Sequence, residues 1–161
     1  MKPFVLAAAL ALIALPAAAQ NAGQIASVRA GASCAGCNLF QADFSGLEMR
    51  GKNFAKARLR QSSLNLATMN RANFSGADLR DVDAFGGVFS SANFSGANLT
   101  NSTWVGAFLE GSNFRGANVS GANFSGAEMA RATGLTQAQL NAACGDQATT
   151  LPGSLSVPAC R

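Results

Sequence analysis

The 161-residue chain contains no histidine and no tyrosine, and only eight acidic and twelve basic residues. Histidine is the commonest general acid or base in enzymes, and nucleophilic triads are built around one. The only close acidic pair is Asp81 and Asp83, which we expect to point outward beside Arg80 as a solvated ion pair. A phosphate-binding glycine loop is also missing. These absences argue against an enzyme and leave no set of residues for a cofactor or a metal ion.

Long hydrophobic runs are missing after the N-terminus. Residues 1–19 combine Lys2, an apolar stretch of about a dozen residues and Ala17-Ala18-Ala19, which is typical of a cleavable secretory signal. A membrane span would need about 20 apolar residues. We therefore expect cleavage after Ala19, a periplasmic or secreted mature chain without a membrane span, and an N-terminal segment at residues 20–33.

The rest of the chain has a period of five. From position 39 to position 129 a large apolar residue returns at every fifth position, and only Ala84 is small. A small residue often stands two positions earlier, and a typical unit reads Ala-Asn-Phe-Ser-Gly. Neither a helix nor a flat strand turns every fifth residue inward, so the chain must turn a corner once per unit. Glycines two positions after the large residue supply many of these corners.

This unit resembles the repeat of the pentapeptide-repeat family, whose consensus is a small residue, Asn or Asp, Leu or Phe, and two polar residues. The resemblance covers residues 34–133. It implies an all-β fold, a right-handed quadrilateral parallel β-helix of about five coils with four units per coil. Residues twenty apart should then stack in four columns: Leu39, Leu59, Leu79, Leu99 and Val119; Phe44, Leu64, Ala84, Trp104 and Phe124; Met49, Met69, Phe89, Leu109 and Met129; and Cys34, Phe54, Phe74, Phe94 and Phe114.

A solenoid needs caps on its ends, and residues 134–161 are predicted to form the C-terminal one. Thr136 and Gln139 have the spacing of a capping box, and Gly145 marks the expected end of a short helix. Leu135 and Leu140 should cover the open coil. This stretch is similar to a tail that bacterial members of the family often carry.

Four cysteines in an exported chain suggest two disulfides, which can be connected in three ways. Cys34 and Cys37 are the first and fourth residues of one corner turn, so their Cα atoms should lie within about 7 Å. Cys144 and Cys160 flank a proline-containing loop at the other end. Five layers make a rod roughly 24 Å long, which disfavours crossed pairs and a zinc site.

Cys34-Ala35-Gly36-Cys37 also has the spacing of a thiol–disulfide exchange motif. That chemistry needs a helix N-terminus after a strand, which this stretch lacks. We therefore favour a structural disulfide and keep a redox role as the alternative function.

Two outward-facing clusters are candidate binding sites. The first is basic and suits an anionic polymer, lipid headgroups or an acidic protein, unless it only aids solubility; it comprises Lys56, Arg58, Arg60, Arg71 and Arg80. The second is apolar and suits a protein partner or a homodimer; it comprises Phe85, Val88, Val105 and Phe108. A local register shift that turns Phe85 inward in place of Ala84 is the alternative explanation of the second cluster.

Together these features predict a non-catalytic binding or scaffold protein of the bacterial envelope. A purely structural role in that envelope fits the sequence equally well. The family's best-known activity is mimicry of duplex DNA by acidic rods that engage a type II topoisomerase. This chain carries a net charge of +4 and an expected export signal, so that activity is disfavoured and no nucleic acid partner is expected.

Overall fold

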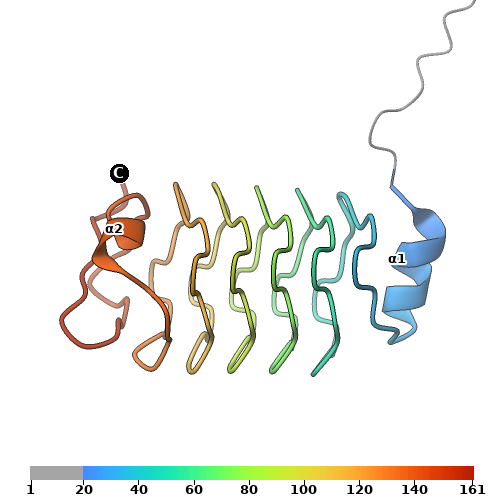
Figure 1. Cartoon of the computed structure of the whole chain (residues 1–161), viewed down its shortest axis with the longest axis horizontal. Helices are drawn as coiled ribbons and strands as arrows, with labels where there is room; N and C mark the ends of the chain where they lie inside the picture. Colours follow the sequence, from blue (N-terminus) through green and yellow to red (C-terminus); the bar gives the residue numbers. More distant parts are fainter. Residues whose placement is uncertain (1–19) are drawn as a thin grey trace, which may run out of the picture.

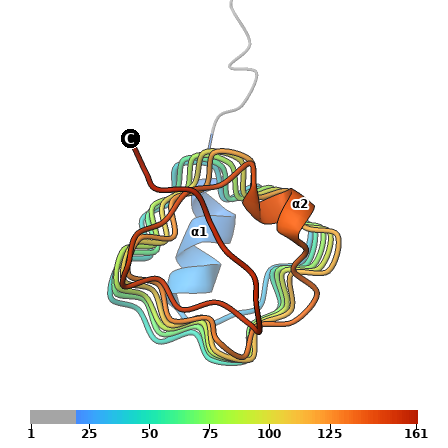
Figure 2. The same ribbon diagram turned by 90° about the vertical axis from the view of Figure 1, so that its left-hand side faces the viewer.

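The computed structural model describes residues 20–161, and the expected signal segment lies outside the described residues. The chain winds as a solenoid whose coils are stacked along one axis between two short helices (Figure 1). Seen along this axis, the coils superimpose as a rounded square (Figure 2). Within residues 20–161, no helix is long and apolar enough to cross a membrane.

Each corner is a four-residue turn that begins at an inward-facing residue. In the turn at Leu39, the amide of Ala42 donates to the Leu39 carbonyl at 3.1 Å. In the turns that begin at Cys34 to Phe124, the third residue has a positive φ, as in a type II turn, and glycine adopts this conformation without strain. Gly46, for example, has φ 69°. Several corners nevertheless use other residues at this position: Gln41, Lys56, Gln61, Leu66, Arg71, Asp81, Ser91 and Asn101.

The straight sides between corners are too short to form extended strands, and the described residues pair through isolated parallel bridges. These bridges join residues twenty apart, from Asn38 with Arg58 to Asn113 with Thr133. Arg58 illustrates the pattern, because its carbonyl accepts from Leu39 and its amide donates to Cys37, each at 2.8 Å. Every coil is thus hydrogen-bonded to the coils before and after it.

The four predicted columns form the core, and their members are all buried. In the aromatic column, successive ring centroids from Phe54 to Phe114 are 5.3, 5.3 and 5.1 Å apart, with the rings nearly parallel. This spacing follows from the strand-like rise of about 4.8 Å per layer. The alanines two positions before the core residues are buried as well, for example Ala72 and Ala92.

The register is continuous at Ala84. Ala84 is fully buried while Phe85 is 52% exposed, so the register shift considered from the sequence is absent. The neighbouring Trp104 packs edge-on against Phe89 and Phe94, with centroid distances of 5.0 and 5.2 Å. Its indole nitrogen donates to the Ser102 hydroxyl at 2.7 Å, so this buried ring also satisfies its polar group.

The N-terminal segment contains a helix that the sequence did not predict. Helix α1 (Ala22–Arg29) begins after Asn21, whose side chain accepts from the Gln24 amide at 3.1 Å. Ile25 and Val28 are buried in the same cluster as the solenoid core. The N-terminal end of the rod is therefore covered by a helix (Figure 1).

The C-terminal cap contains helix α2 (Gln137–Leu140), and the predicted capping box of Thr136 and Gln139 is confirmed. Leu140 is fully buried, and Leu135 packs on the core. The predicted helix end at Gly145 is wrong, because the chain leaves the helix at Asn141 and returns to the ladder. Cys144 bridges to Asn123, and Gly145 bridges to Ala159 in the tail.

Candidate functional site

The surface consists of four flat faces and four edges. Each face is lined by the residues that directly precede one column of core residues. The first face carries Asn38, Arg58, Asp78, Asn98 and Asn118; the second Asp43, Ser63, Asp83, Thr103 and Asn123; the third Glu48, Thr68, Val88, Phe108 and Glu128; and the fourth Asn53, Asn73, Asn93, Asn113 and Thr133. The edges are numbered by the face they follow, so the first edge joins the first and second faces.

The fourth face is an asparagine ladder. The side-chain amide of Asn73 donates to Asn53, that of Asn93 to Asn73, and that of Asn113 to Asn93, each at 3.3 Å. The same side-chain oxygens accept from backbone amides two residues later, such as Ser75 at 3.0 Å. The side-chain oxygens of this face thus already accept hydrogen bonds within the chain, so the face is a poor candidate for ligand binding.

Arginines of the first edge are paired with carboxylates. Arg60 Nε donates to Asp81 at 3.1 Å, and Arg80 binds Asp78 through two hydrogen bonds of 2.7 Å. Arg58 lies on the adjoining first face, with its guanidinium 5.3 Å from the centre of the Phe40 ring. These contacts offset much of the positive charge that the sequence placed here.

The five residues of the predicted basic cluster do not form a single surface. Lys56 lies on the fourth edge, one side away from Arg60, and Arg71 lies on the third edge, diagonally across the coil from Arg60. The sequence contained the signal for this, because positions 60 and 71 are eleven residues apart, about half of a twenty-residue coil. Only Arg58, Arg60 and Arg80 are neighbours.

The acidic pair also separates. Asp81 lies on the first edge and binds Arg60, whereas Asp83 lies on the second face and accepts from the Asn65 side chain at 2.9 Å. Arg80 binds Asp78 instead of either of them. The two carboxylates therefore do not form one site.

The Asp78–Arg80 pair predicts how stability depends on pH. The hydrogen bonds from Arg80 lower the pKa of Asp78 below its ordinary value of 3.8. The pair therefore stabilises the fold above this value, and its contribution is lost as pH falls through the lowered pKa. We expect Asp78→Asn to cost up to about 1 kcal/mol at neutral pH, measured by urea unfolding, and less below the pKa. A cost that is the same at neutral and strongly acidic pH would contradict the prediction.

Exposed apolar residues gather around the second edge. Leu66, Phe85 and Phe108 are the exposed large apolar residues of the described chain, at 62%, 52% and 41% exposure. Val88 lies beside Phe108 on the third face, and Val105 is partly buried on the second edge. We call this surface the apolar ridge: Leu66, Phe85, Val88, Val105 and Phe108.

The sequence analysis did not assign Leu66 to this surface, although its position twenty residues before Gly86 places it on the same edge. The Leu66 amide donates to the Phe85 carbonyl at 2.9 Å, so the two residues lie in adjacent coils. A Cβ atom at Gly86 would lie only 2.9 Å from Cδ2 of Leu66. The glycine therefore leaves room for the leucine to lie over the next coil.

The structure joins Cys34 to Cys37 and Cys144 to Cys160, and the described residues contain no free cysteine. This is the pairing that the spacing of the sequence favoured. Cys34 is buried in the core cluster, and its amide donates to the Asn53 carbonyl at 2.8 Å. Helix α1 ends at Arg29, before Cys34, so the pair does not lie at a helix N-terminus as it would in a thioredoxin-like site.

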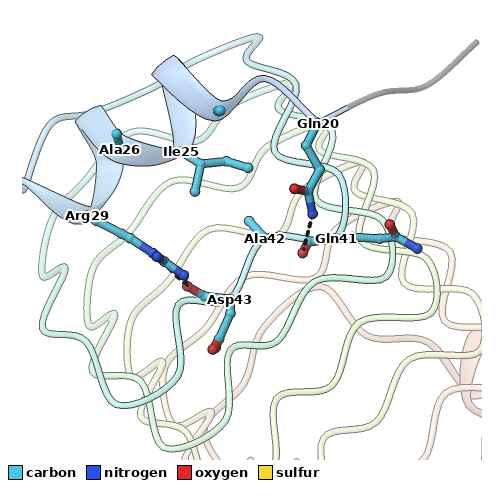
Figure 3. A pocket seen from close by; sticks show the side chains of 8 residues that line it. Gln20, Ile25, Ala26, Arg29, Gln41, Ala42 and Asp43 are labelled. Carbon is cyan, nitrogen blue, oxygen red and sulfur yellow. Dashed lines mark hydrogen bonds between the residues drawn. The ribbon is translucent and has the colours of Figure 1, made fainter. Parts of the chain in front are cut away.

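Hollows of the described surface lie at both ends of the rod and on its third edge. The first, of about 350 Å³, lies between α1 and the first coil (Figure 3). Arg29 crosses it and donates to the Asp43 carbonyl from Nε and Nη2, at 3.2 and 2.9 Å. Gln20 donates to the Gln41 carbonyl at 2.9 Å. These bonds attach the N-terminal cap to backbone carbonyls of the first coil.

Two further hollows lie on the C-terminal cap and on the rod itself. The hollow on the cap is lined by Asp146, Val157 and Cys160 among others. The hollow on the rod, of about 450 Å³, lies on the third edge and is lined by Arg50, Gly51, Asn70 and Arg71. Among residues 20–161, no cluster of His, Cys, Asp or Glu side chains is arranged to hold a metal ion.

Comparisons with known proteins agree with this repeat architecture. A family profile described as pentapeptide repeats matches residues 48–83 and 92–129, in eight copies. A pentapeptide repeat protein from the Arabidopsis thaliana thylakoid lumen is 34% identical, with 62% of this chain and 69% of that one covered and a TM-score of 0.39. The chain belongs to the pentapeptide-repeat family. Proteins of this family are generally structural or binding proteins and not enzymes.

Two further solved structures of this family are similar to the chain. Rfr23 from the cyanobacterium Cyanothece 51142 is 25% identical, covering 74% of this chain and 90% of its own, with a TM-score of 0.35. QnrB1, a plasmid-mediated fluoroquinolone resistance protein, is 21% identical over 67% of this chain and 79% of its own, with a TM-score of 0.31. A comparison with curated proteins gave no match.

Within this pentapeptide-repeat protein, the apolar ridge departs from the family consensus. The two positions after each core residue are polar in the consensus unit, yet Leu66, Phe85 and Val105 occupy such positions on one edge. The core of the solenoid does not need these side chains, because they point outward. The ridge is therefore the surface that repeat stability alone does not explain.

Proposed function

We propose that this protein is a non-catalytic binding protein of the bacterial envelope that presents the apolar ridge to a protein partner. The observation that carries the proposal is the gathering of Leu66, Phe85 and Phe108, all exposed, on one edge and its adjoining face. Contiguous exposed apolar surface is uncommon on soluble monomers and is typical of interaction sites.

The rod supports such a role mechanically. Phe85 and Val105 follow the buried residues Ala84 and Trp104 directly in the chain, so the packed columns fix the backbone beneath the ridge. A hydrogen bond also fixes the backbone at Phe85, because the Phe85 amide donates to the Asn65 side chain at 2.9 Å. A preformed surface loses little conformational entropy on binding, which favours affinity.

The envelope location rests on the N-terminal sequence pattern together with the four cysteines. Two disulfides in the folded chain fit an oxidising compartment. The basic residues of the first edge are a less suitable binding surface, because Arg60 and Arg80 are already paired with Asp81 and Asp78.

Site-specific photo-crosslinking in cells would test the proposal. A photoreactive residue at Phe85 or Phe108 should yield a defined adduct with one protein, whereas the same residue at Asn93, on the asparagine ladder, should yield none. After the partner has been purified, Phe85→Asp with Phe108→Asp should weaken its binding at least tenfold, because both side chains would lose their apolar contact.

Arg58→Glu with Arg60→Glu is the matched control, since it changes charge on the same rod away from the apolar ridge. It should leave the affinity within about twofold. Equal crosslinking from Phe85 and Asn93, or a ridge double mutant that binds like the unmodified protein, would refute the proposal.

A further inference from the structure

The third edge carries a second candidate site, separate from the apolar ridge. Its hollow of about 450 Å³ is lined by Arg50, Gly51, Asn70 and Arg71. Arg50 and Gly51 form the corner of one coil, and Asn70 and Arg71 form the same corner of the next. The amide of Gly51 donates to the Asn70 carbonyl at 2.8 Å, which holds the two corners in register.

The two arginines of this hollow retain unused hydrogen-bond donors. Arg71 takes part in no ion pair among the described residues, and the only carboxylate near Arg50 is that of Glu48, at 3.8 Å. Both members of that weak pair are exposed, at 65% and 74% of their side-chain surface. Elsewhere on the rod, Arg60, Arg80 and Arg131 are all held by closer carboxylates.

The space between the arginines is open. Gly51 lies in the coil next to Arg71 and twenty positions before it, and a Cβ atom built on Gly51 would meet nothing within 4 Å. Gly51 therefore leaves room for a ligand between the two corners.

We infer that this hollow binds the phosphate group of a phosphate monoester between Arg50 and Arg71. A monoester carries a charge of about −1.5 to −2 near neutral pH, which two guanidinium groups balance. Guanidinium groups bind phosphate oxygens through paired, charge-assisted hydrogen bonds.

The chain offers a matched pair of variants at Gly51, where φ is 67°. Aspartate and asparagine both tolerate this conformation here, since Asp81 and Asn101 adopt φ values of 57° and 56° at the equivalent position of other corners. Gly51→Asp places a carboxylate between the arginines and should block the ligand. Gly51→Asn has nearly the same shape without the charge and should leave binding largely intact.

The experiment is an NMR titration of the ¹⁵N-labelled protein at constant ionic strength with glucose 6-phosphate, inorganic phosphate or glucose. Glucose 6-phosphate and inorganic phosphate should both shift the amide signals of Gly51, Asn70 and Arg71 saturably, and glucose should cause no shift. Arg71→Gln should weaken binding about tenfold. Gly51→Asp should abolish it, whereas Phe85→Asp on the apolar ridge should change nothing.

Several outcomes would overturn the inference. Shifts that fail to saturate at high millimolar ligand, or that are the same in Gly51→Asp and Gly51→Asn, would exclude an anion site here. Equal shifts with glucose and with glucose 6-phosphate would show that the phosphate group is not recognised. Circular dichroism of each variant would show whether the solenoid remains folded.

Discussion

Replacing Phe94 by alanine is expected to destabilise the protein by about 3–5 kcal/mol. Phe94 is fully buried in the middle of the aromatic column, between the rings of Phe74 and Phe114 at 5.3 and 5.1 Å. It also meets the edge of Trp104 at 5.2 Å. Because the coils before and after fix the backbone through hydrogen bonds, the structure cannot collapse to fill the cavity.

Urea unfolding followed by circular dichroism would measure this loss. Phe85→Ala is the appropriate control, since it removes the same side chain from a position that is 52% exposed and should cost less than about 1 kcal/mol. Similar losses for both variants would mean that the aromatic column does not stabilise the rod as the structure indicates.

Removing the Cys144–Cys160 disulfide should cost about 3 kcal/mol, the second-largest effect that we expect. The bridge closes a loop of 16 residues and fixes the tail beside the last coils. Cys144 lies in the ladder, where its amide donates to Ala122 and its carbonyl accepts from Phe124. Without the bridge, the tail is held mainly by its hydrogen bonds, such as that from Cys160 to Gly145.

The double variant Cys144→Ser, Cys160→Ser would be compared with Cys34→Ser, Cys37→Ser in thermal and urea unfolding. The Cys34–Cys37 bridge spans only three positions, so loop closure predicts a smaller cost of about 2 kcal/mol for its removal. A larger loss at Cys34 and Cys37 would contradict the loop-closure argument. A reduction potential of that pair in the range of disulfide oxidoreductases would instead revive the redox alternative.

The repeat architecture could be predicted from the sequence because each unit repeats the same local geometry. A period of five fixes which residues face inward, and a stacking interval of twenty fixes which side chains meet, so the columns through Phe94 and Leu99 could be assigned residue by residue. The capping box at Thr136 could be predicted equally well, since it depends on only four consecutive residues. The same periodicity placed Phe85 and Phe108 on the surface.

The features that the sequence did not reveal depend on contacts outside the repeat. Helix α1 has only two buried residues, Ile25 and Val28, and its stability comes from packing on the first coil. The pairing of Asp81 with Arg60 depends on the side-chain conformations of two adjacent coils. Similarly, the end of α2 is set by the return of Cys144 to the ladder, which local helix signals do not encode.

The interval of twenty residues also determines how such a chain can change in length. An insertion or deletion of five residues keeps the repeat pattern but rotates every later unit by one side. The Phe114 position would then meet a different column, and each ladder of like side chains would be interrupted at the site of the change. Duplication of a twenty-residue segment keeps every column aligned and only lengthens the rod. Length variation in genes for such rods should therefore proceed by whole coils.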